Sequence, residues 1–185
     1  MISFDFVKNC YGCGLCKSVC PKKAIEMKEN KEGFLNPVID MSKCVQCGLC
    51  EKKCLYLNEK TVERINKNDK AYAVQINDKS SLKKSSSGGF FYEIAKNFIE
   101  NGGYVAGCIW DENMMPVHIL SNNIKDIEKM QGSKYVQSDL RDIFLDIKKI
   151  IDEKKVLFTG TPCQVKAIKS FINNDNLVTI SLICE

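Results

Sequence analysis

Several kinds of residue and segment are scarce in this sequence, and each scarcity excludes a class of protein. The 185 residues contain one histidine, His118, and no run of about 18 apolar residues that could span a bilayer. The first six residues include no basic region followed by a long apolar stretch, so they do not resemble a secretory signal. We therefore expect a soluble, cytoplasmic protein without a membrane span.

Dense basic runs are missing as well. The formal net charge of +4 comes from lysines scattered over the whole chain, and no basic run is interleaved with aromatic residues. This distribution is typical of a solvated surface and argues against a nucleic-acid-binding protein. His118 lies in an expected strand without a partner motif, so we expect a structural role for it, either hydrogen-bonded or solvated.

Cysteine, in contrast, is abundant: the chain has 11. Eight of them form two runs of identical spacing, Cys10, Cys13, Cys16 and Cys20, then Cys44, Cys47, Cys50 and Cys54. Gaps of two, two and three residues are too short for a strand or helix to separate the thiols, so each loop must coil and point its sulfurs inward. Glycines at 12, 14 and 48 suit such a tight wrap, because they allow backbone N–H groups to approach closely. The spacing is typical of bacterial ferredoxins with two 4Fe-4S clusters.

Two other uses of these cysteines fit the pattern less well. Zinc sites pair C-x-x-C units across a long spacer, and two runs of four leave no such pairing. A disulfide framework is disfavoured by the odd number of cysteines and by the lack of a secretory signal. In two-cluster ferredoxins the last cysteine of each run ligates the other cluster. Carried over, this predicts one cluster on Cys10, Cys13, Cys16 and Cys54, and a second on Cys44, Cys47, Cys50 and Cys20.

The chain divides into two expected domains and a linker. Residues 1–57 form the ferredoxin-type domain, in which residues 24–27 and 34–39 are expected to pair as a hairpin around a turn at 30–33. Its core would be largely inorganic, so it should not fold without iron. Residues 58–70 are polar and form the linker, either a short helix or a loose tether. Residues 71–185 form the second domain.

Strand and helix patterns alternate in this second domain. We expect strands at residues 71–76, 104–110, 116–120, 156–159 and 178–184, and helices at 90–99, 139–153 and 164–172, with Asp139 as an N-cap. The near-continuous apolar strands favour a covered sheet. The predicted fold class is therefore α+β: a small two-cluster ferredoxin domain followed by an α/β domain with a mainly parallel or mixed sheet, here incomplete.

Two loops of the second domain carry candidate chemistry. Residues 85–89, Ser-Ser-Ser-Gly-Gly, precede a helix and suit a phosphate, although they could equally be an N-cap on a flexible loop. Residues 160–163, Gly-Thr-Pro-Cys, repeat the arrangement after a strand, where α/β sheets bind ligands. Cys163 at this helix start is either a ligand or a reactive thiol. Cys184 is a weaker candidate for the same roles, and Cys108 is expected to be a small apolar core residue.

Three motifs behind the cysteine runs together carry a resemblance: Ser-Ser-Gly-Gly-Phe at 86–90, Gly-Ser-Lys-Tyr-Val-Gln at 132–137 and Gly-Thr-Pro-Cys-Gln-Val at 160–165. In this order, over nearly the whole chain, they resemble the family of coenzyme F-420 hydrogenase and dehydrogenase beta subunits. The resemblance implies FAD on the α/β domain, in a pocket that includes Ser87, Gly88, Gly89, Lys134, Tyr135 and Thr161. It also implies a metal-ligand role for Cys163, because some members bind a further cluster beside the flavin.

Members of that family continue well past the position of Cys184, so we expect this chain to be a fragment of such a protein. The resemblance predicts an oxidoreductase that passes electrons between a reduced two-electron donor, similar to a deazaflavin, and an acceptor, which is a redox partner protein or a small molecule. FAD and two 4Fe-4S clusters would carry them. Two alternatives stay open: a non-enzymatic ferredoxin-type carrier whose α/β part only docks a partner, and an inactive remnant. No catalytic residue is predicted.

Overall fold

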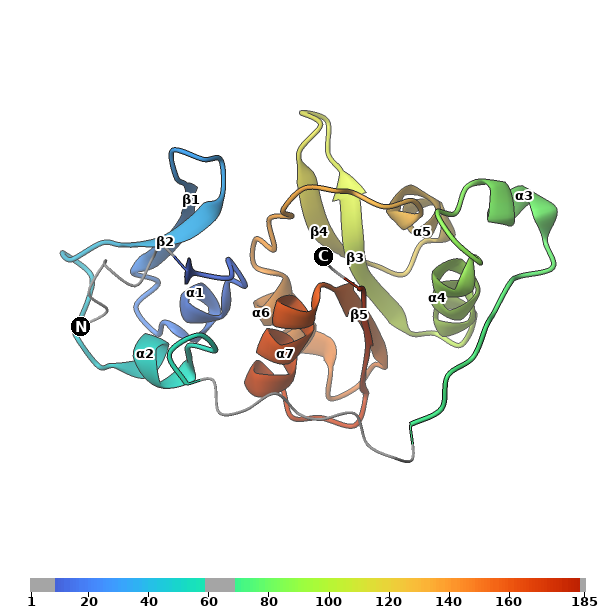
Figure 1. The fold of residues 1–185 in the computed structure, drawn as a ribbon. Coiled ribbons are helices and arrows are strands. Elements are labelled where there is room, and N and C mark those ends of the chain that lie inside the picture. Colours follow the sequence, from blue (N-terminus) through green and yellow to red (C-terminus); the bar gives the residue numbers. More distant parts are fainter. Residues whose placement is uncertain (1–8, 59–68, 184–185) are drawn as a thin grey trace.

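The computed structural model describes residues 9–58 and 69–183, which form a small cysteine-rich unit and a larger α/β unit (Figure 1). The small unit consists of α1 (Leu15–Val19), β1 (Ile25–Glu29), β2 (Leu35–Ile39) and α2 (Leu49–Lys53). The larger unit consists of α3 (Lys79–Lys83), α4 (Phe90–Glu100), β3 (Tyr104–Trp110), β4 (Pro116–Ser121), α5 (Ile124–Met130), α6 (Ile143–Ile150), β5 (Val156–Gly160), α7 (Pro162–Phe171) and β6 (Leu177–Ser181). The predicted fold class is confirmed.

The small unit is built from two similar halves. Gly14 and Gly48 adopt the left-handed conformation, with φ of 66° and 73°, and begin α1 and α2 respectively. Both helices have five residues and end at the last cysteine of a run, where the backbone becomes extended. The expected hairpin is present as the antiparallel pair β1–β2, with Ile25 opposite Ile39. The duplicated spacing in the sequence is therefore a duplicated structure.

The larger unit is organised on a mixed four-stranded sheet with the order β4-β3-β5-β6. β3 and β4 form an antiparallel hairpin, whereas β3–β5 and β5–β6 are parallel. The central strand β5 is buried at every position, because helices cover both of its faces. β6 lies at the edge of the sheet and is only half-buried, with Val178 42% exposed.

Each face of the sheet has its own apolar core. On one face, α4 and α5 cover Val105 and Leu157. On the other, α6 and α7 cover Phe158, and this core also contains Leu15 from α1 of the small unit. Leu15 is 1% exposed, so the two units share one hydrophobic core.

Polar contacts join the units beside this shared core. Lys17 Nζ forms an ion pair with Asp142 Oδ1 at 3.0 Å and donates to the Arg141 carbonyl at 3.1 Å. Lys53 Nζ, on α2, donates to the Ser170 carbonyl at the end of α7, at 3.5 Å. Exposed contacts of this kind contribute little free energy but restrict how the units can rotate against each other.

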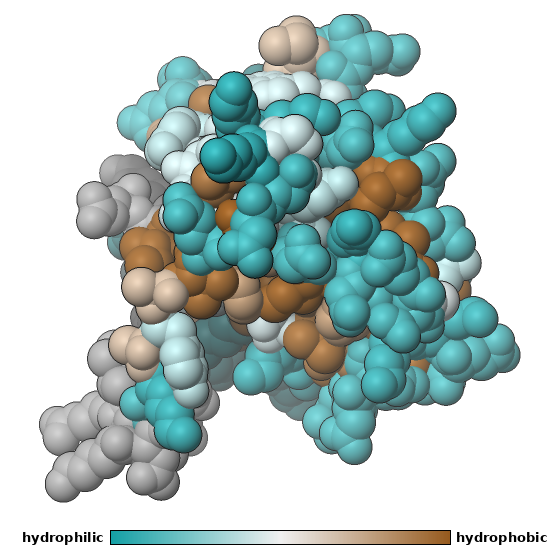
Figure 2. Space-filling view, turned by 90° about the vertical axis from the view of Figure 1, so that its right-hand side faces the viewer, coloured by the Kyte–Doolittle hydropathy of each residue, from teal (hydrophilic) through white to brown (hydrophobic). Residues whose placement is uncertain are grey.

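Residues 71–76, predicted as a strand, are not one. They follow an exposed path and attach to the α4 loop instead, where Ile76 N donates to the Gly88 carbonyl at 2.8 Å. Tyr72 and Val74 are 75% and 49% exposed, and this face of the molecule shows hydrophobic surface between hydrophilic side chains (Figure 2). The alternating pattern was misleading, because these residues pair with none of the four strands of the sheet.

The predicted helix at 139–153 begins four residues late. Asp139 does not cap it: it forms a bridge with Val117, next to β4, and its Oδ1 accepts from Arg141 N at 2.7 Å. Arg141 has a positive φ of 47°, which no helix allows, so α6 starts at Ile143 with Asp142 as its N-cap. The short helices α3 and α5 were not predicted, nor were α1 and α2, which run through the cysteine runs where coiled loops were expected.

The remaining predicted strands and helices are present within one to three residues of their expected bounds. Most of the expected linker, and Cys184, lie outside the described residues. Within residues 9–58 and 69–183, no helix is long and apolar enough to cross a membrane.

Candidate functional site

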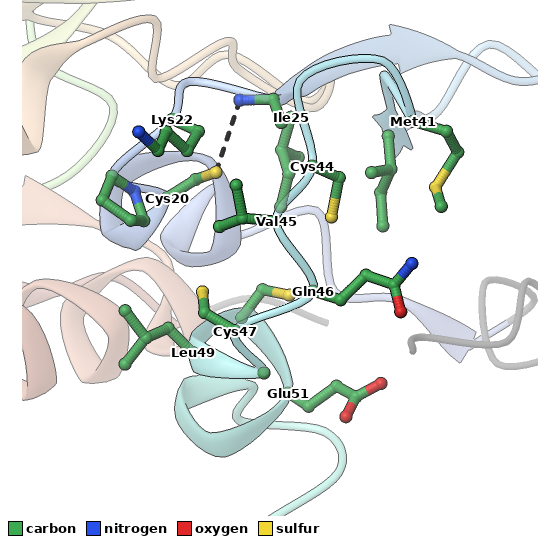
Figure 3. A pocket seen from close by; sticks show the side chains of 15 residues that line it. Cys20, Lys22, Ile25, Met41, Cys44, Val45, Gln46, Cys47, Leu49 and Glu51 are labelled. Atoms are coloured by element: carbon green, nitrogen blue, oxygen red, sulfur yellow. Dashed lines mark hydrogen bonds between the residues drawn. The ribbon is translucent and has the colours of Figure 1, made fainter.

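The thiols expected to hold the second cluster line one hollow on the small unit. It lies between the loop of the second cysteine run, the start of α2 and the residues around β1 and β2, and its lining includes Cys20, Cys44, Cys47 and Cys50. Figure 3 shows the side chains of Cys20, Cys44 and Cys47 around it. Ala24 N donates to Cys20 Sγ at 3.3 Å, as backbone amides do toward cluster thiolates. We name these four residues the outer thiol set.

The other four cysteines are likewise close to one another. Electrostatic interaction with Cys54 acts on the thiols of Cys10, Cys13 and Cys16, although these lie at least 38 positions before Cys54 in the sequence. Gly12 N donates to Cys10 Sγ at 3.4 Å. We name Cys10, Cys13, Cys16 and Cys54 the inner thiol set. The two sets are those that ligand exchange between the runs requires.

The inner thiols are the more deeply enclosed. Burial raises the pKa of Cys13 to about 11 and that of Cys16 to about 12, and it also raises the pKa of Cys10. These thiols therefore carry their protons near neutral pH until a metal displaces them, and cluster assembly must release protons. Among the described residues, no three His, Cys, Asp or Glu side chains converge as ligands of a single metal ion do. The grouping into two sets of four suits the larger 4Fe-4S cubane.

Cys163 brings the α/β unit to the inner thiol set. It follows Thr161 and Pro162 at the start of α7, and its Sγ lies 3.8 Å from the carbonyl of Tyr11, inside the first cysteine run. Burial raises the pKa values of Cys10 and Cys13, and electrostatic interaction with Cys163 adds to this effect. The thiol also contacts Thr161 Oγ1 at 3.1 Å. The helix start that sequence analysis singled out is thus in contact with the ferredoxin-type unit.

Gln137 makes a second link that the sequence did not reveal. It belongs to the loop from α5 to α6, which crosses over the sheet toward the small unit (Figure 1). Its Oε1 accepts from Leu35 N at 2.6 Å, and its Nε2 lies where a side chain on Gly12 would begin. Gln137 ends the Gly-Ser-Lys-Tyr-Val-Gln motif at 132–137, but the motif does not indicate its partners, which lie over 100 residues away in the sequence.

Two of the loops expected to bind FAD, the one before α4 and the one after α5, are hydrogen-bonded to each other. Ser133 N donates to Ser86 Oγ at 2.7 Å, and Gln131 Nε2 donates to Ser85 Oγ at 3.0 Å. Ser87 is exposed beside them. Gly88 lies so close to the Val74 carbonyl that a Cβ would collide with it, and Gly89 begins α4 with φ of 78°. The contact between the two loops lies near the start of α4, and the residues at 86, 87 and 133 are exposed to solvent.

Lys134, which was expected in the FAD pocket, contacts backbone carbonyls in this structure. Its Nζ donates to four carbonyls at the end of α5, those of residues 129, 130, 131 and 132, at 2.9 to 3.1 Å. Burial lowers the pKa of this ammonium group. The neighbouring Tyr135 is 93% exposed. In this structure Lys134 caps a helix, and Tyr135 is the member of the pair that is accessible to a ligand.

His118 lies buried under the same region. Its Nε2 donates to the Thr159 carbonyl at 3.0 Å and its ring stacks on Phe158, with centroids 5.6 Å apart. Nδ1 has no hydrogen-bond partner among the described residues. Burial lowers the pKa of His118 to about 4, so the ring is neutral at physiological pH. Of the two ring nitrogens, Nε2 is thus hydrogen-bonded, as expected for a structural role, whereas Nδ1 is buried without a partner among the described residues.

Comparisons with known proteins agree with the cysteine pattern. Residues 9–57 match the model of the 4Fe-4S dicluster domain family. The chain is 26% identical, over 95% of its length, to a subunit of the F(420)H(2) dehydrogenase of Methanosarcina mazei, and covers 53% of that protein. It is 27% identical, over 86% of its length, to the coenzyme F420-dependent sulfite reductase of Methanocaldococcus jannaschii, and covers 24% of that protein.

A solved structure is also similar. It is described as a xenon derivative of the F420-reducing [NiFe] hydrogenase complex from Methanosarcina barkeri; one of its chains matches 60% of this chain with a TM-score of 0.50 and 24% identity. This match, which spans 42% of that chain, supports the fold. The present chain spans about half the length of its relative in the F(420)H(2) dehydrogenase.

Proposed function

We propose that this chain passes electrons between a reduced deazaflavin-type donor and a protein acceptor. It carries a 4Fe-4S dicluster domain at residues 9–57 and is similar to F420-linked oxidoreductases over most of its length. In this proposal the inner and outer thiol sets each hold one cluster, and FAD binds to the α/β unit. When bound, FAD would accept a hydride and release single electrons, which the clusters would carry one at a time.

One observation carries this proposal: the 3.8 Å contact between Cys163 Sγ and the Tyr11 carbonyl. It places the loop that ends β5 directly against the inner thiol set. Ligands of α/β sheets bind at the carboxyl ends of the strands, so a flavin there would lie next to the inner set. The outer set, in contrast, faces a hollow whose lining includes the exposed Met41 and Val45. The inner set is thus suited to receive electrons and the outer set to deliver them.

The residues proposed for FAD form two groups. Ser87, Gly88 and Gly89 offer a hydroxyl and backbone N–H groups at the start of α4, which suit the negative charge of a diphosphate. Thr161 lies at the start of α7, which covers the other face of the sheet, and contacts Cys163. Tyr135 offers an exposed ring, whereas Lys134 would have to leave four carbonyls before it could reach a phosphate. Cys163 is proposed as a further ligand or as a thiol beside the flavin.

The bonding of Lys134 favours a second candidate, a carrier without flavin. If its Nζ only caps α5, the proposed pocket has lost its cation, and the α/β unit serves to dock a partner protein. The two candidates share the clusters and differ in FAD binding.

Anaerobic reconstitution with iron and sulfide tests both. The proposal requires about eight irons per chain, saturable quenching of FAD fluorescence, and bleaching of the cluster absorbance by reduced deazaflavin only when FAD is present. A matched variant, Gly88→Val, should abolish FAD binding and leave the iron content unchanged, because its side chain would collide with the Val74 carbonyl away from all the cysteines. Eight irons without FAD binding would establish the carrier; one or two zinc ions per chain would contradict both candidates.

A further inference from the structure

Gln137, in the α5–α6 loop, hydrogen-bonds through its side chain to the cysteine-rich unit. Two of its atoms engage two different segments there. Oε1 accepts from the backbone N–H of Leu35, on β2, at 2.6 Å, and Nε2 presses against Gly12, between the first two cysteines. The side chain is half-buried between the units, so it bridges them under partial protection from solvent.

The duplication within the small unit shows why position 12 is a glycine. Gly12 corresponds to Gln46 in the second run, and both residues have a positive φ, 63° and 53°. The wrap therefore tolerates a side chain at this position. In the first run, however, a Cβ would collide with Nε2 of Gln137, whereas Gln46 is exposed to solvent. The glycine at position 12 therefore makes room for Gln137, and for the Leu35 carbonyl, which would lie 3.0 Å from a Cβ.

Gly12 is also the residue that hydrogen-bonds a predicted ligand. Its N–H donates to Cys10 Sγ at 3.4 Å. Hydrogen bonds to cluster sulfurs stabilise the more negative, reduced state and so raise the reduction potential. Nε2 of Gln137 lies against this same residue, at the position that a Cβ would occupy.

We propose that Gln137 is a positioning residue which holds the Gly12 N–H on the sulfur of Cys10 and thereby sets the reduction potential of the cluster bound by the inner thiol set. The inference rests on the proposed function for the presence of that cluster. It adds a role for the α/β unit: the loop that carries Lys134 and Tyr135 acts on the inner cluster through Gln137, two residues beyond Tyr135, and does not act on the outer one.

The two clusters of one chain give the experiment an internal control. Reconstituted wild type and Gln137→Ala are titrated potentiometrically under anaerobic conditions, with the two clusters followed by electron paramagnetic resonance. Cys54→Ser and Cys20→Ser assign the signals to the inner and outer sets. We expect Gln137→Ala to move the inner cluster to a lower potential and to leave the outer cluster at its wild-type value. The matched variant Gln46→Ala, at the equivalent exposed position, should leave the inner cluster unchanged.

A charged variant makes the test sharper. Gln137→Glu retains an acceptor for Leu35 N–H but places a carboxylate against Gly12, so the inner cluster should move to a lower potential than in Gln137→Ala. Should Gln137→Ala fail to assemble its clusters, Gln137→Asn, one methylene too short to span both contacts, provides the same comparison. An equal shift of both clusters would show general loosening and overturn the inference, as would an unmoved inner cluster. Wild-type protein that assembles no clusters would refute the proposed function as well.

Discussion

Replacing Leu15 by alanine should destabilise the α/β unit, although Leu15 lies between two cysteines of the ferredoxin-type unit. The side chain is 1% exposed and belongs to the same core as Leu140 and Phe144. Leu→Ala changes in such cores cost about 2–5 kcal/mol, the transfer free energy of the lost methyl groups plus the cavity left behind. We expect about 3 kcal/mol, which for a chain of this size lowers the melting temperature by about 9 °C.

The second cysteine run supplies a matched control. Leu49 is the counterpart of Leu15, since both follow the glycine that begins a helix, but Leu49 is 40% exposed. Leu49→Ala should therefore cost less than about 1 kcal/mol. The two variants remove the same atoms from equivalent positions, so the difference isolates burial against the α/β unit.

Guanidinium unfolding of the reconstituted protein measures both costs. Trp110 fluorescence reports on β3 in the α/β unit, and cluster absorbance reports on the cysteine-rich unit. In Leu15→Ala both transitions should move to lower denaturant concentration, because the core is shared. The reasoning is refuted if the Trp110 transition stays at its wild-type midpoint, or if the two variants cost the same.

Three further outcomes are expected. Cys54→Ser should remove the cluster formed with Cys10, Cys13 and Cys16, and Cys20→Ser the other; the reverse assignment by electron paramagnetic resonance would show that the runs do not exchange ligands. His118 has a folded-state pKa of about 4 against 6.5 when unfolded, so the unfolded state binds more protons between these values and stability falls as pH falls. From pH 7 to pH 5 the wild type should therefore lose about 2 kcal/mol more of its unfolding free energy than His118→Gln. Equal losses in chemical denaturation would contradict this. Lys134→Met should cost about 2 kcal/mol, since half-buried carbonyls at the end of α5 lose their donor. An unchanged unfolding midpoint would show that these hydrogen bonds contribute nothing.

Local patterns were sufficient wherever one segment determines its own structure. The hairpin around residues 30–33 and the buried strand β5 follow from turn chemistry and from apolar runs, and both are present. Residues 71–76 alternate like a strand, yet they pair with neither edge strand of the sheet and attach to the loop before α4 instead. The start of α6 was misplaced because Arg141 adopts a positive φ, which sequence periodicity does not reveal.

The candidate site shows the same division. Grouping the cysteines into two sets followed from their spacing, but which set faces the α/β unit depends on how Leu15 packs against α6 and α7, a long-range property. Gln137 belongs to a motif that the sequence offered, but its contacts could not be predicted, because its partners, Gly12 and Leu35, lie in another unit. Lys134 fits a phosphate-binding motif by type, and only the structure reveals the carbonyls that surround its ammonium group.

The shared core also constrains how the protein is made. Cys54 leaves the ribosome more than a hundred residues before Ile168, the part of α7 that helps to bury Leu15. At about 5–20 residues per second, this interval lasts on the order of 10 s. During it the face of α1 that bears Leu15 is uncovered, and an iron–sulfur donor can approach the inner thiols from the side that Cys163 later closes. Iron that is delivered before this closure therefore meets a more open site.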